Sequence, residues 1–161
     1  MPLDQAFVDD CPYGPGGLLI DEILEIDADR DFVRARMPTS ASLPLTREQR
    51  ANAVRHPSHV SGGLMVHMTG MVAFAHSYYV LGLRHADGWI GYGVRIHEGK
   101  FHALAPPGDP LILECKATRI RKLRGQIFAR YSFRFTQGDT LVYEGDQTAV
   151  WSQVELASKS A

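Results

Sequence analysis

The sequence lacks the features that would point to several large classes of protein. Its 161 residues include only two cysteines, Cys11 and Cys115, whose spacing is not that of a metal-binding motif. The formal net charge of −1 gives no overall positive field that would attract nucleic acid. No apolar run reaches the roughly 18–20 residues that span a bilayer, and the first ten residues lack the apolar core of a signal peptide. We therefore expect a cytoplasmic protein with no metal, no nucleic-acid partner and no membrane partner.

Two catalytic motifs are also missing. No Gly-x-Ser-x-Gly sequence is present, which argues against a serine hydrolase. The segment 91–93, "GYG", lies in a strand-like pattern and lacks the spacing and the lysine of a phosphate-binding loop. Acidic residues are absent between Pro57 and Tyr79. Acid–base chemistry in that stretch would therefore depend on histidine.

What the sequence does contain fits one globular domain over 1–161. This length is that of one domain, and 45% hydrophobic with 22% charged residues is ordinary for a protein with a packed core. We expect 1–17 to be an irregular N-terminal loop, because "CPYGPGG" is dense in proline and glycine. We expect 154–161 to be a frayed tail. Cys115, inside a strand-like segment, is expected to be a small buried apolar side chain.

Alternation of apolar and polar residues predicts an antiparallel sheet. The segment 32–38 alternates strictly, which predicts a half-buried strand paired with 18–26 as a hairpin. The segment 18–26 also fits a short helix. The residues 46–49, "TREQ", have the form of a capping box and predict a short helix that stops before Pro57. Further strands are predicted over 89–104, 110–123, 126–137 and 140–153.

One long helix is predicted over 62–80. The stretch has no proline, and Leu64, Met68, Met71 and Ala75 follow helical spacing. Because the segment is apolar nearly all round, we expect the helix to be buried. One helix and one antiparallel sheet must cover each other's apolar surfaces. An α+β fold with the sheet wrapped around a central helix is therefore the simplest architecture.

Sequence motifs accompany these elements and narrow the choice of fold. Residues 12–27, "PYGPGGLLIDEILEID", are similar to the start of the beta-hydroxyacyl-carrier-protein dehydratases. Residues 56–70, "HPSHVSGGLMVHMTG", resemble the start of the helix in A-factor-biosynthesis-type hotdog proteins, and 100–113 resembles the strand-turn-strand after it. Over 12–153 the chain therefore resembles the hotdog-fold superfamily of acyl thioesterases and dehydratases, and this resemblance implies a hotdog fold and a homodimer or dimer of dimers. It implies an acyl thioester of coenzyme A or of an acyl carrier protein, bound at the subunit interface, and no cofactor.

The resemblance does not extend to the dehydratase catalytic pair. Those enzymes pair a loop histidine with a carboxylate in the helix. The position of that carboxylate falls on His67 when Gly62 is matched to the family's glycine, and on Met68 when Gly63 is matched. Neither register supplies a carboxylate, so standard dehydratase chemistry is not expected.

Three histidines near the start of the predicted helix are the candidate catalytic residues: His56, His59 and His67. An imidazole exchanges protons near neutral pH, and a well-placed base contributes ~10²–10⁴-fold to a rate. The N–H groups at a helix start favour negative charge, and glycine leaves them open to a ligand. The candidate oxyanion and substrate-binding residues are therefore Ser61, Gly62 and Gly63.

Simpler roles remain open for these residues. Ser61 could only cap the helix, His56 could bind backbone groups, and His67 could be a core histidine with a polar partner. The segment 119–124, "RIRKLR", is expected at a solvated hairpin tip, where it could also meet coenzyme A phosphates or an acidic carrier protein. Structural or surface roles are expected for His76, His85, His97 and His102.

Three functions fit this pattern. The first is hydrolysis of an acyl thioester by water that His59 or His67 activates, with backbone N–H groups as the oxyanion hole. The second is a dehydratase or hydratase-like reaction on a beta-hydroxyacyl thioester, with two histidines in place of the usual pair. The third is a non-catalytic acyl-CoA-binding protein, which the missing carboxylate keeps open.

Overall fold

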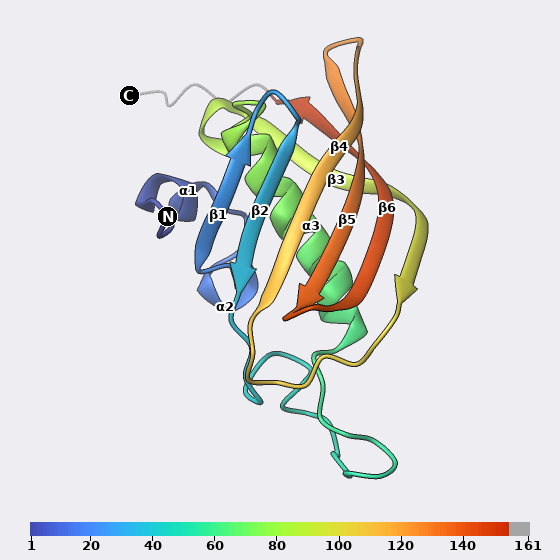
Figure 1. The fold of residues 1–161 in the computed structure, drawn as a ribbon. Helices are drawn as coiled ribbons and strands as arrows, with labels where there is room; N and C mark the ends of the chain where they lie inside the picture. Colours follow the sequence, from blue (N-terminus) through green and yellow to red (C-terminus); the bar gives the residue numbers. More distant parts are fainter. Residues whose placement is uncertain (155–161) are drawn as a thin grey trace.

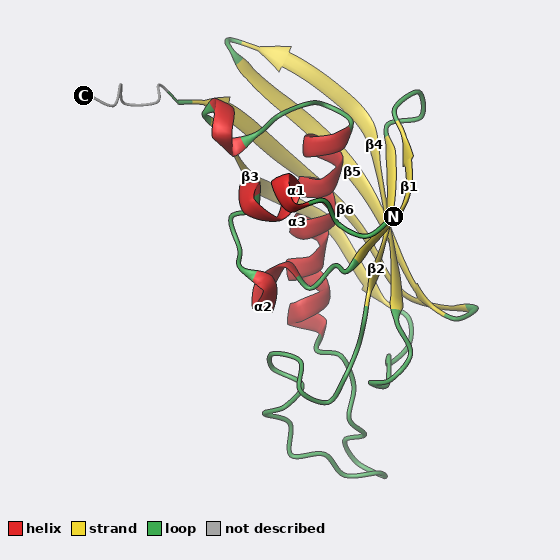
Figure 2. Cartoon of the chain, turned by 90° about the vertical axis from the view of Figure 1, so that its left-hand side faces the viewer, coloured by secondary structure: helices red, strands yellow, loops and turns green. Residues whose placement is uncertain are grey.

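The structure, a computed structural model, describes residues 1–154. Its centre is one long helix, α3 (Gly62–Tyr79), against a six-stranded sheet in the order β1-β2-β4-β5-β6-β3. Every pair of neighbouring strands is antiparallel. Figures 1 and 2 show the sheet curved around α3, with the helix on its concave side. The predicted architecture, a sheet wrapped around one central helix, is confirmed.

The strands follow the period-two segments of the sequence. The hairpin consists of β1 (Glu22–Asp27) and β2 (Phe32–Met37). The long strands are β3 (Trp89–Phe101), β4 (Leu111–Leu123), β5 (Gln126–Gln137) and β6 (Thr140–Gln153). The bounds of β4, β5 and β6 lie within one residue of the prediction, whereas β3 ends three residues earlier.

The N-terminal segment is more regular than the sequence predicts. Helices α1 (Gln5–Asp10) and α2 (Pro15–Leu18) occupy much of the region expected to be irregular. Asp4 caps α1, because its carboxylate accepts a hydrogen bond from the Phe7 N–H at 2.7 Å. The buried Phe7 ring then fixes this short helix to the core. Since α2 ends only at Leu18, the first strand begins at Glu22 rather than at residue 18. Of the predicted tail, residues 155–161 lie outside the described part.

The loop between β2 and α3, residues 38–61, contains no helix where the capping-box pattern predicts one. The Thr46 hydroxyl and the Gln49 side-chain amide both donate to the His59 carbonyl, at 3.2 and 2.9 Å. The Gln49 side-chain oxygen accepts from the His59 N–H at 3.1 Å. These side chains therefore hold the loop onto the residues before α3 instead of starting a helix. Figure 2 shows this projecting loop extending beyond the sheet and the helix.

The core lies between α3 and the concave side of the sheet. Met68, Val72 and Ala75 of α3 are fully buried. Burying a Met or Val side chain stabilises a fold by about 1.5–3 kcal/mol. Cys115 of β4 is also fully buried, and burial raises the pKa of its thiol, as expected for an apolar packing role. None of the helices in the described part of the chain combines the length and hydropathy needed to cross a bilayer.

The two edges of the sheet differ. The edge strand β1 has six residues, and an isolated bridge between Pro2 and Glu22 covers part of it. The other edge strand, β3, has thirteen residues, all of which are exposed except Trp89. Apolar residues that are 44–56% exposed occupy every second position from 90 to 96 of β3, namely Ile90, Tyr92, Val94 and Ile96. A long, apolar and unpaired edge is a surface on which another strand can pair.

Candidate functional site

The first backbone N–H groups of α3 have no side-chain cap. Ser61 holds the N-cap position, as predicted for a capping role, but its hydroxyl makes no capping hydrogen bond. Gly62 and Gly63 form the first helical positions, and Gly63 is exposed. The donors of this helix start and the positive end of its dipole are therefore open to a carbonyl or anionic oxygen.

A cavity of about 230 Å³ lies beside this helix start. We call it the N-terminal cavity, after the N-terminal end of α3. It is lined by His59, Val60, Gly62, Met65, Phe101, Ala103 and Leu104. A Cβ atom on Gly62 would lie 3.0 Å from the Phe101 ring. Glycine at this position therefore lets the ring pack directly over the first turn of the helix. His59 and Gly62 are brought together as the sequence predicts.

The His59 imidazole has one free ring nitrogen. Its Nδ1 lies 2.8 Å from the Pro57 carbonyl oxygen. Because a carbonyl can only accept, Nδ1 carries the proton of the neutral ring and Nε2 holds a lone pair. The exposed His56 ring lies edge-on to His59, with the ring centres 5.1 Å apart, but His56 does not line the cavity. His59 is therefore the better placed of the two to act as a base.

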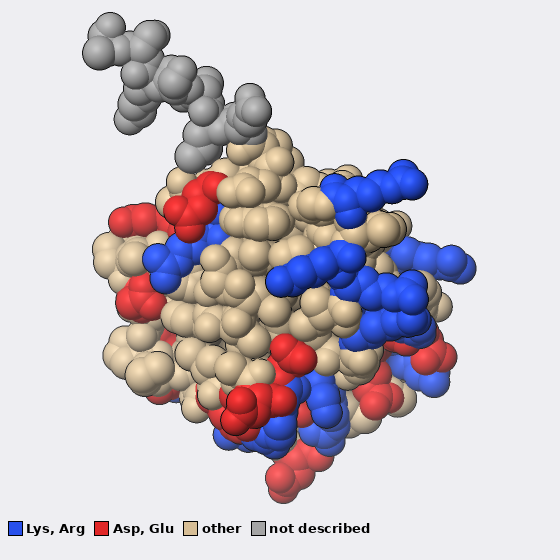
Figure 3. Space-filling model, turned by 90° about the horizontal axis from the view of Figure 1, so that it is seen from above, with Lys and Arg blue, Asp and Glu red and all other residues tan. Residues whose placement is uncertain are grey.

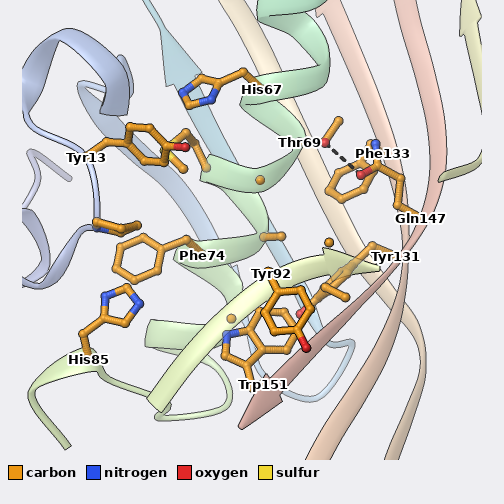
Figure 4. Close-up of a pocket in the computed structure, with 17 residues that line it drawn as sticks. Tyr13, His67, Thr69, Phe74, His85, Tyr92, Tyr131, Phe133, Gln147 and Trp151 are labelled. Atoms are coloured by element: carbon orange, nitrogen blue, oxygen red, sulfur yellow. Dashed lines mark hydrogen bonds between the residues drawn. The ribbon is translucent and has the colours of Figure 1, made fainter. Parts of the chain in front are cut away.

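A second cavity, of about 280 Å³, lies farther along α3. Figure 4 shows His67, Tyr13, Phe74 and His85 following one another along one side of it. We call it the aromatic cavity. Its lining consists of Pro12, Tyr13, His67, Thr69, Gly70, Met71, Ala73, Phe74, His85, Gly91, Tyr92, Gly93, Tyr131, Phe133, Gln147, Ala149 and Trp151. This lining is suited to an apolar group with few polar atoms.

His67 lines the aromatic cavity and is tied to the N-terminal segment. Its Nε2 lies 2.7 Å from the Gly17 carbonyl oxygen, so Nε2 carries the proton and Nδ1 holds the lone pair. The Tyr13 ring meets the imidazole edge-on, with ring centres 4.8 Å apart. His67 thus has the polar partner that a partly buried imidazole needs. It lies in a different cavity from His59, so one chain does not bring the two histidines together.

Of the residues that line the aromatic cavity, sequence reasoning named only His67 as a site candidate and missed the others, His85 and Tyr13 among them. His85, expected to be structural or on the surface, stacks on Phe74 with ring centres 5.4 Å apart and contacts the Asp10 carbonyl oxygen through Nδ1 at 2.5 Å. Tyr13 lies in the "CPYGPGG" segment that was expected to be only a loop. An aromatic side chain within that Gly- and Pro-rich segment was the available signal for Tyr13. No local pattern marks His85.

A buried histidine lies behind the wall of the aromatic cavity. The Tyr131 ring lines the cavity, and its hydroxyl lies 3.1 Å from Nδ1 of His76 on α3. His76 is fully buried. Burial lowers the pKa of His76 to about 4, while the Asp31 carboxylate, 3.9 Å from Nε2, opposes that shift. His76 is thus neutral at pH 7 and has a structural role, as the sequence suggests.

Neither cavity has a carboxylate in its lining. Besides tyrosine hydroxyls and the Trp151 indole, the aromatic cavity has polar groups on Thr69 of α3 and Gln147 of β6, whose side-chain oxygens lie 3.1 Å apart. Within the part of the chain that the structure describes, proton transfer beside α3 therefore falls to imidazoles. The arrangement can bind a carbonyl at the helix start, activate water with His59 and hold an apolar group farther along the helix.

No family model matches the sequence, and the comparison with curated proteins finds no match. Several solved structures are similar. The dehydratase heterocomplex ApeI:P from Xenorhabdus doucetiae has a TM-score of 0.63 at 14% identity, covering 96% of this chain and 92% of that chain. A mutant thioesterase from Pseudomonas aeruginosa has a TM-score of 0.62 at 15% identity, covering 96% of both chains.

A hot-dog-like protein from Thermanaerovibrio acidaminovorans has a TM-score of 0.58 at 18% identity, covering 76% of this chain and 82% of that chain. At such identities the likeness shows the fold. The strand order and the single central helix agree with it. The chain therefore has the hotdog fold, which these thioesterase- and dehydratase-type proteins share.

Proposed function

We propose that the protein hydrolyses an acyl thioester whose carbonyl binds at the start of α3. The observation that carries this proposal is the uncapped helix start at Gly62 and Gly63, open beside a cavity that also holds the free Nε2 of His59. The carbonyl oxygen accepts from these backbone N–H groups, which stabilise the negative charge that develops on it during attack. Comparable donors are worth about 10²–10³ in kcat.

The reaction needs one base and one water. Nε2 of His59 takes a proton from the water, and the resulting hydroxide forms a bond to the carbonyl carbon. When the tetrahedral intermediate collapses, the C–S bond breaks and the imidazolium returns its proton to the leaving thiolate. The products are a carboxylic acid and a thiol, and His59 is again neutral.

A second copy of the chain completes the site. The long apolar edge of β3 supports pairing with the same strand of another copy. Antiparallel self-pairing about a two-fold axis sets the Phe101 end of one strand against the Trp89 end of the other. The N-terminal cavity contains Phe101, and the aromatic cavity contains Gly91 near the opposite end of β3. The two cavities then adjoin across the dimer, and the acyl group extends from His59 into the aromatic cavity of the second copy.

A panel of acyl-CoA thioesters with a free-thiol assay tests the reaction. We expect thiol release. A change in enoyl absorbance without thiol would instead indicate the dehydratase or hydratase-like reaction. Saturable binding with neither signal would indicate an acyl-CoA-binding protein and overturn the hydrolase proposal.

Light scattering tests the dimer. Val94→Lys adds a like charge to both strands of the proposed pair, so we expect the variant to be a monomer at micromolar concentration and the parent chain to be a dimer. Leu24→Lys on the opposite edge strand is the control, since Leu24 is also an exposed apolar residue. A monomeric parent chain would contradict a site formed by two copies of the chain.

A further inference from the structure

The β4–β5 hairpin extends beyond the neighbouring strand β2. Pairing between β2 and β4 ends at Lys116, whereas β4 continues to pair with β5 as far as Leu123. The turn residues Arg124 and Gly125 both have positive φ, at 52° and 77°, the conformation that two-residue hairpin turns need. Figure 1 shows this hairpin projecting past the end of the sheet. We call residues 116–126 the basic hairpin.

The basic hairpin concentrates positive charge. Between residues 115 and 138 the sequence has seven Lys and Arg and no Asp or Glu. Arg130 and Arg134 form ion pairs, with Asp146 and Glu114. In the view from the end at which the hairpin projects, Lys and Arg gather on one side of the molecule (Figure 3). Among the residues that the structure describes, the cations exposed here without an ion-pair partner are Lys116, Arg119, Arg121, Lys122 and Arg124.

The shape of the basic hairpin favours a large partner over a small one. A free phosphate group needs donors that converge around it, as in a cleft, whereas these cations point outward from a projecting two-stranded element. Leu123 lies among them at the tip and is 59% exposed. Cations around one exposed apolar side chain match the acidic surface of a folded protein, with an apolar contact at its centre.

The basic hairpin lies close to the aromatic cavity. Ile127 of β5 pairs with Trp151 of β6, and Trp151 lines that cavity. From Ile127 to Arg124 the chain advances three residues, which is ~10 Å at the rise of a strand. Trp151 also pairs with Gly91 of β3. A domain docked on the hairpin would therefore sit near the part of the aromatic cavity that adjoins the N-terminal cavity of the second copy, where the thioester lies in the proposed dimer.

We propose that the basic hairpin docks an acidic carrier protein that presents the acyl group as a thioester. The thiol to which the acyl group is attached then belongs to a carrier protein rather than to coenzyme A. This inference rests on the proposed function, because it specifies which molecule carries the acyl group of that thioester.

The test compares the same acyl group as two thioesters: octanoyl-CoA and a purified acidic acyl carrier protein loaded with octanoate. The double variant Arg121→Glu, Lys122→Glu reverses two charges of the basic hairpin. Its control, Arg50→Glu, Arg55→Glu, makes the same change in net charge on exposed residues of the projecting loop.

We expect the hairpin variant to lose about 10-fold or more in kcat/KM on the carrier substrate and less than about two-fold on octanoyl-CoA. The control should change neither by more than about two-fold, and all variants should keep the melting temperature of the parent.

Two other kinetic outcomes overturn the docking proposal. Equal losses on both substrates would place coenzyme A phosphates on the hairpin. No loss on either would mean that its cations only protect the unpaired edge of β4. If the parent chain hydrolyses neither substrate, fluorescence anisotropy with the labelled carrier decides. Binding that the hairpin variant loses and the control keeps supports docking while the hydrolase proposal fails. Absence of binding by the parent chain overturns docking as well.

Discussion

The two cavities beside α3 divide the requirements of the proposed hydrolysis between them. The N-terminal cavity offers backbone donors and a histidine with a free Nε2, while the aromatic cavity offers rings and a histidine whose Nε2 is held by Gly17. The first is equipped to polarise a carbonyl, and the second to enclose an apolar group. Because they lie at different levels of one helix, a single chain holds both halves of a site without joining them. Substitutions that affect one cavity and spare the other therefore test this division.

The largest effect is expected at the helix start. Gly62→Val should lower kcat by about 10²–10³, because the new side chain meets the Phe101 ring and displaces the carbonyl from the helix donors. Gly16→Val is the control, since a Cβ at Gly16 meets nothing within 4 Å. Steady-state kinetics and a thermal melt would be compared for both. A folded Gly62→Val variant with full activity would place the carbonyl elsewhere.

Acid should weaken the wall of the aromatic cavity. The pKa of His76 is about 4 in the folded state against 6.5 in the unfolded chain, so between these values the unfolded state binds more protons. His76 therefore does not lower the free energy of unfolding above pH 6.5. As the pH drops from 6.5 towards 4, the free energy of unfolding falls. The total loss is about 3 kcal/mol.

Urea titrations along this pH range would measure the effect of His76. The variant His76→Gln should lack this part of the pH dependence, while carboxylates contribute equally to both proteins. The nearby groups are Asp31, which favours the charged ring, and Tyr131, whose hydroxyl contacts Nδ1. His97→Gln on exposed β3 is the matched control. Identical pH profiles for the parent and His76→Gln would contradict the assignment.

The fold could be predicted because its signals are local and strong. Strict alternation marks β5, and an uninterrupted apolar run marks α3, so tertiary contacts reinforce what the sequence already favours. The segment 46–49 failed as a helix because Thr46 and Gln49 bond the His59 backbone, a contact ten or more residues away. Short α1 formed because a cap at Asp4 and burial of Phe7 outweigh its length.

The candidate site could be predicted only where its residues are contiguous in sequence. His59 and Gly62 are three residues apart and share a cavity as expected. His67 is five residues beyond Gly62, which is ~7.5 Å along a helix, and it faces the second cavity. His85 reaches that cavity through contacts with Asp10, 75 residues earlier in the chain. Periodicity carries no information about such pairings.

The next-largest effect on activity is expected at His59, and it distinguishes His59 from His67. His59→Ala should lower kcat/KM by about 10²-fold, or roughly 2.7 kcal/mol of transition-state stabilisation, with little change in melting temperature. His67→Ala should instead lower stability by about 1 kcal/mol, because it removes the hydrogen bond to Gly17, and should act mainly through KM. His56→Ala, outside both cavities, should leave kinetics and stability nearly unchanged. A larger loss of kcat in His67→Ala than in His59→Ala would exchange their roles.

The smallest effect is expected at Tyr13. Tyr13 is 48% exposed and its ring meets the His67 imidazole edge-on, so Tyr13→Ala opens the aromatic cavity without removing a hydrogen bond to the substrate carbonyl. Truncating a half-exposed aromatic contact costs about 0.5–1.5 kcal/mol, which corresponds to an increase in KM of about two- to ten-fold with kcat unchanged. Tyr13→Phe keeps the ring and should match the parent, since the packing lies in the ring rather than in the hydroxyl. If Tyr13→Ala lowered kcat as strongly as His59→Ala, the aromatic cavity would take part in the chemistry, and the division between the two cavities would be wrong.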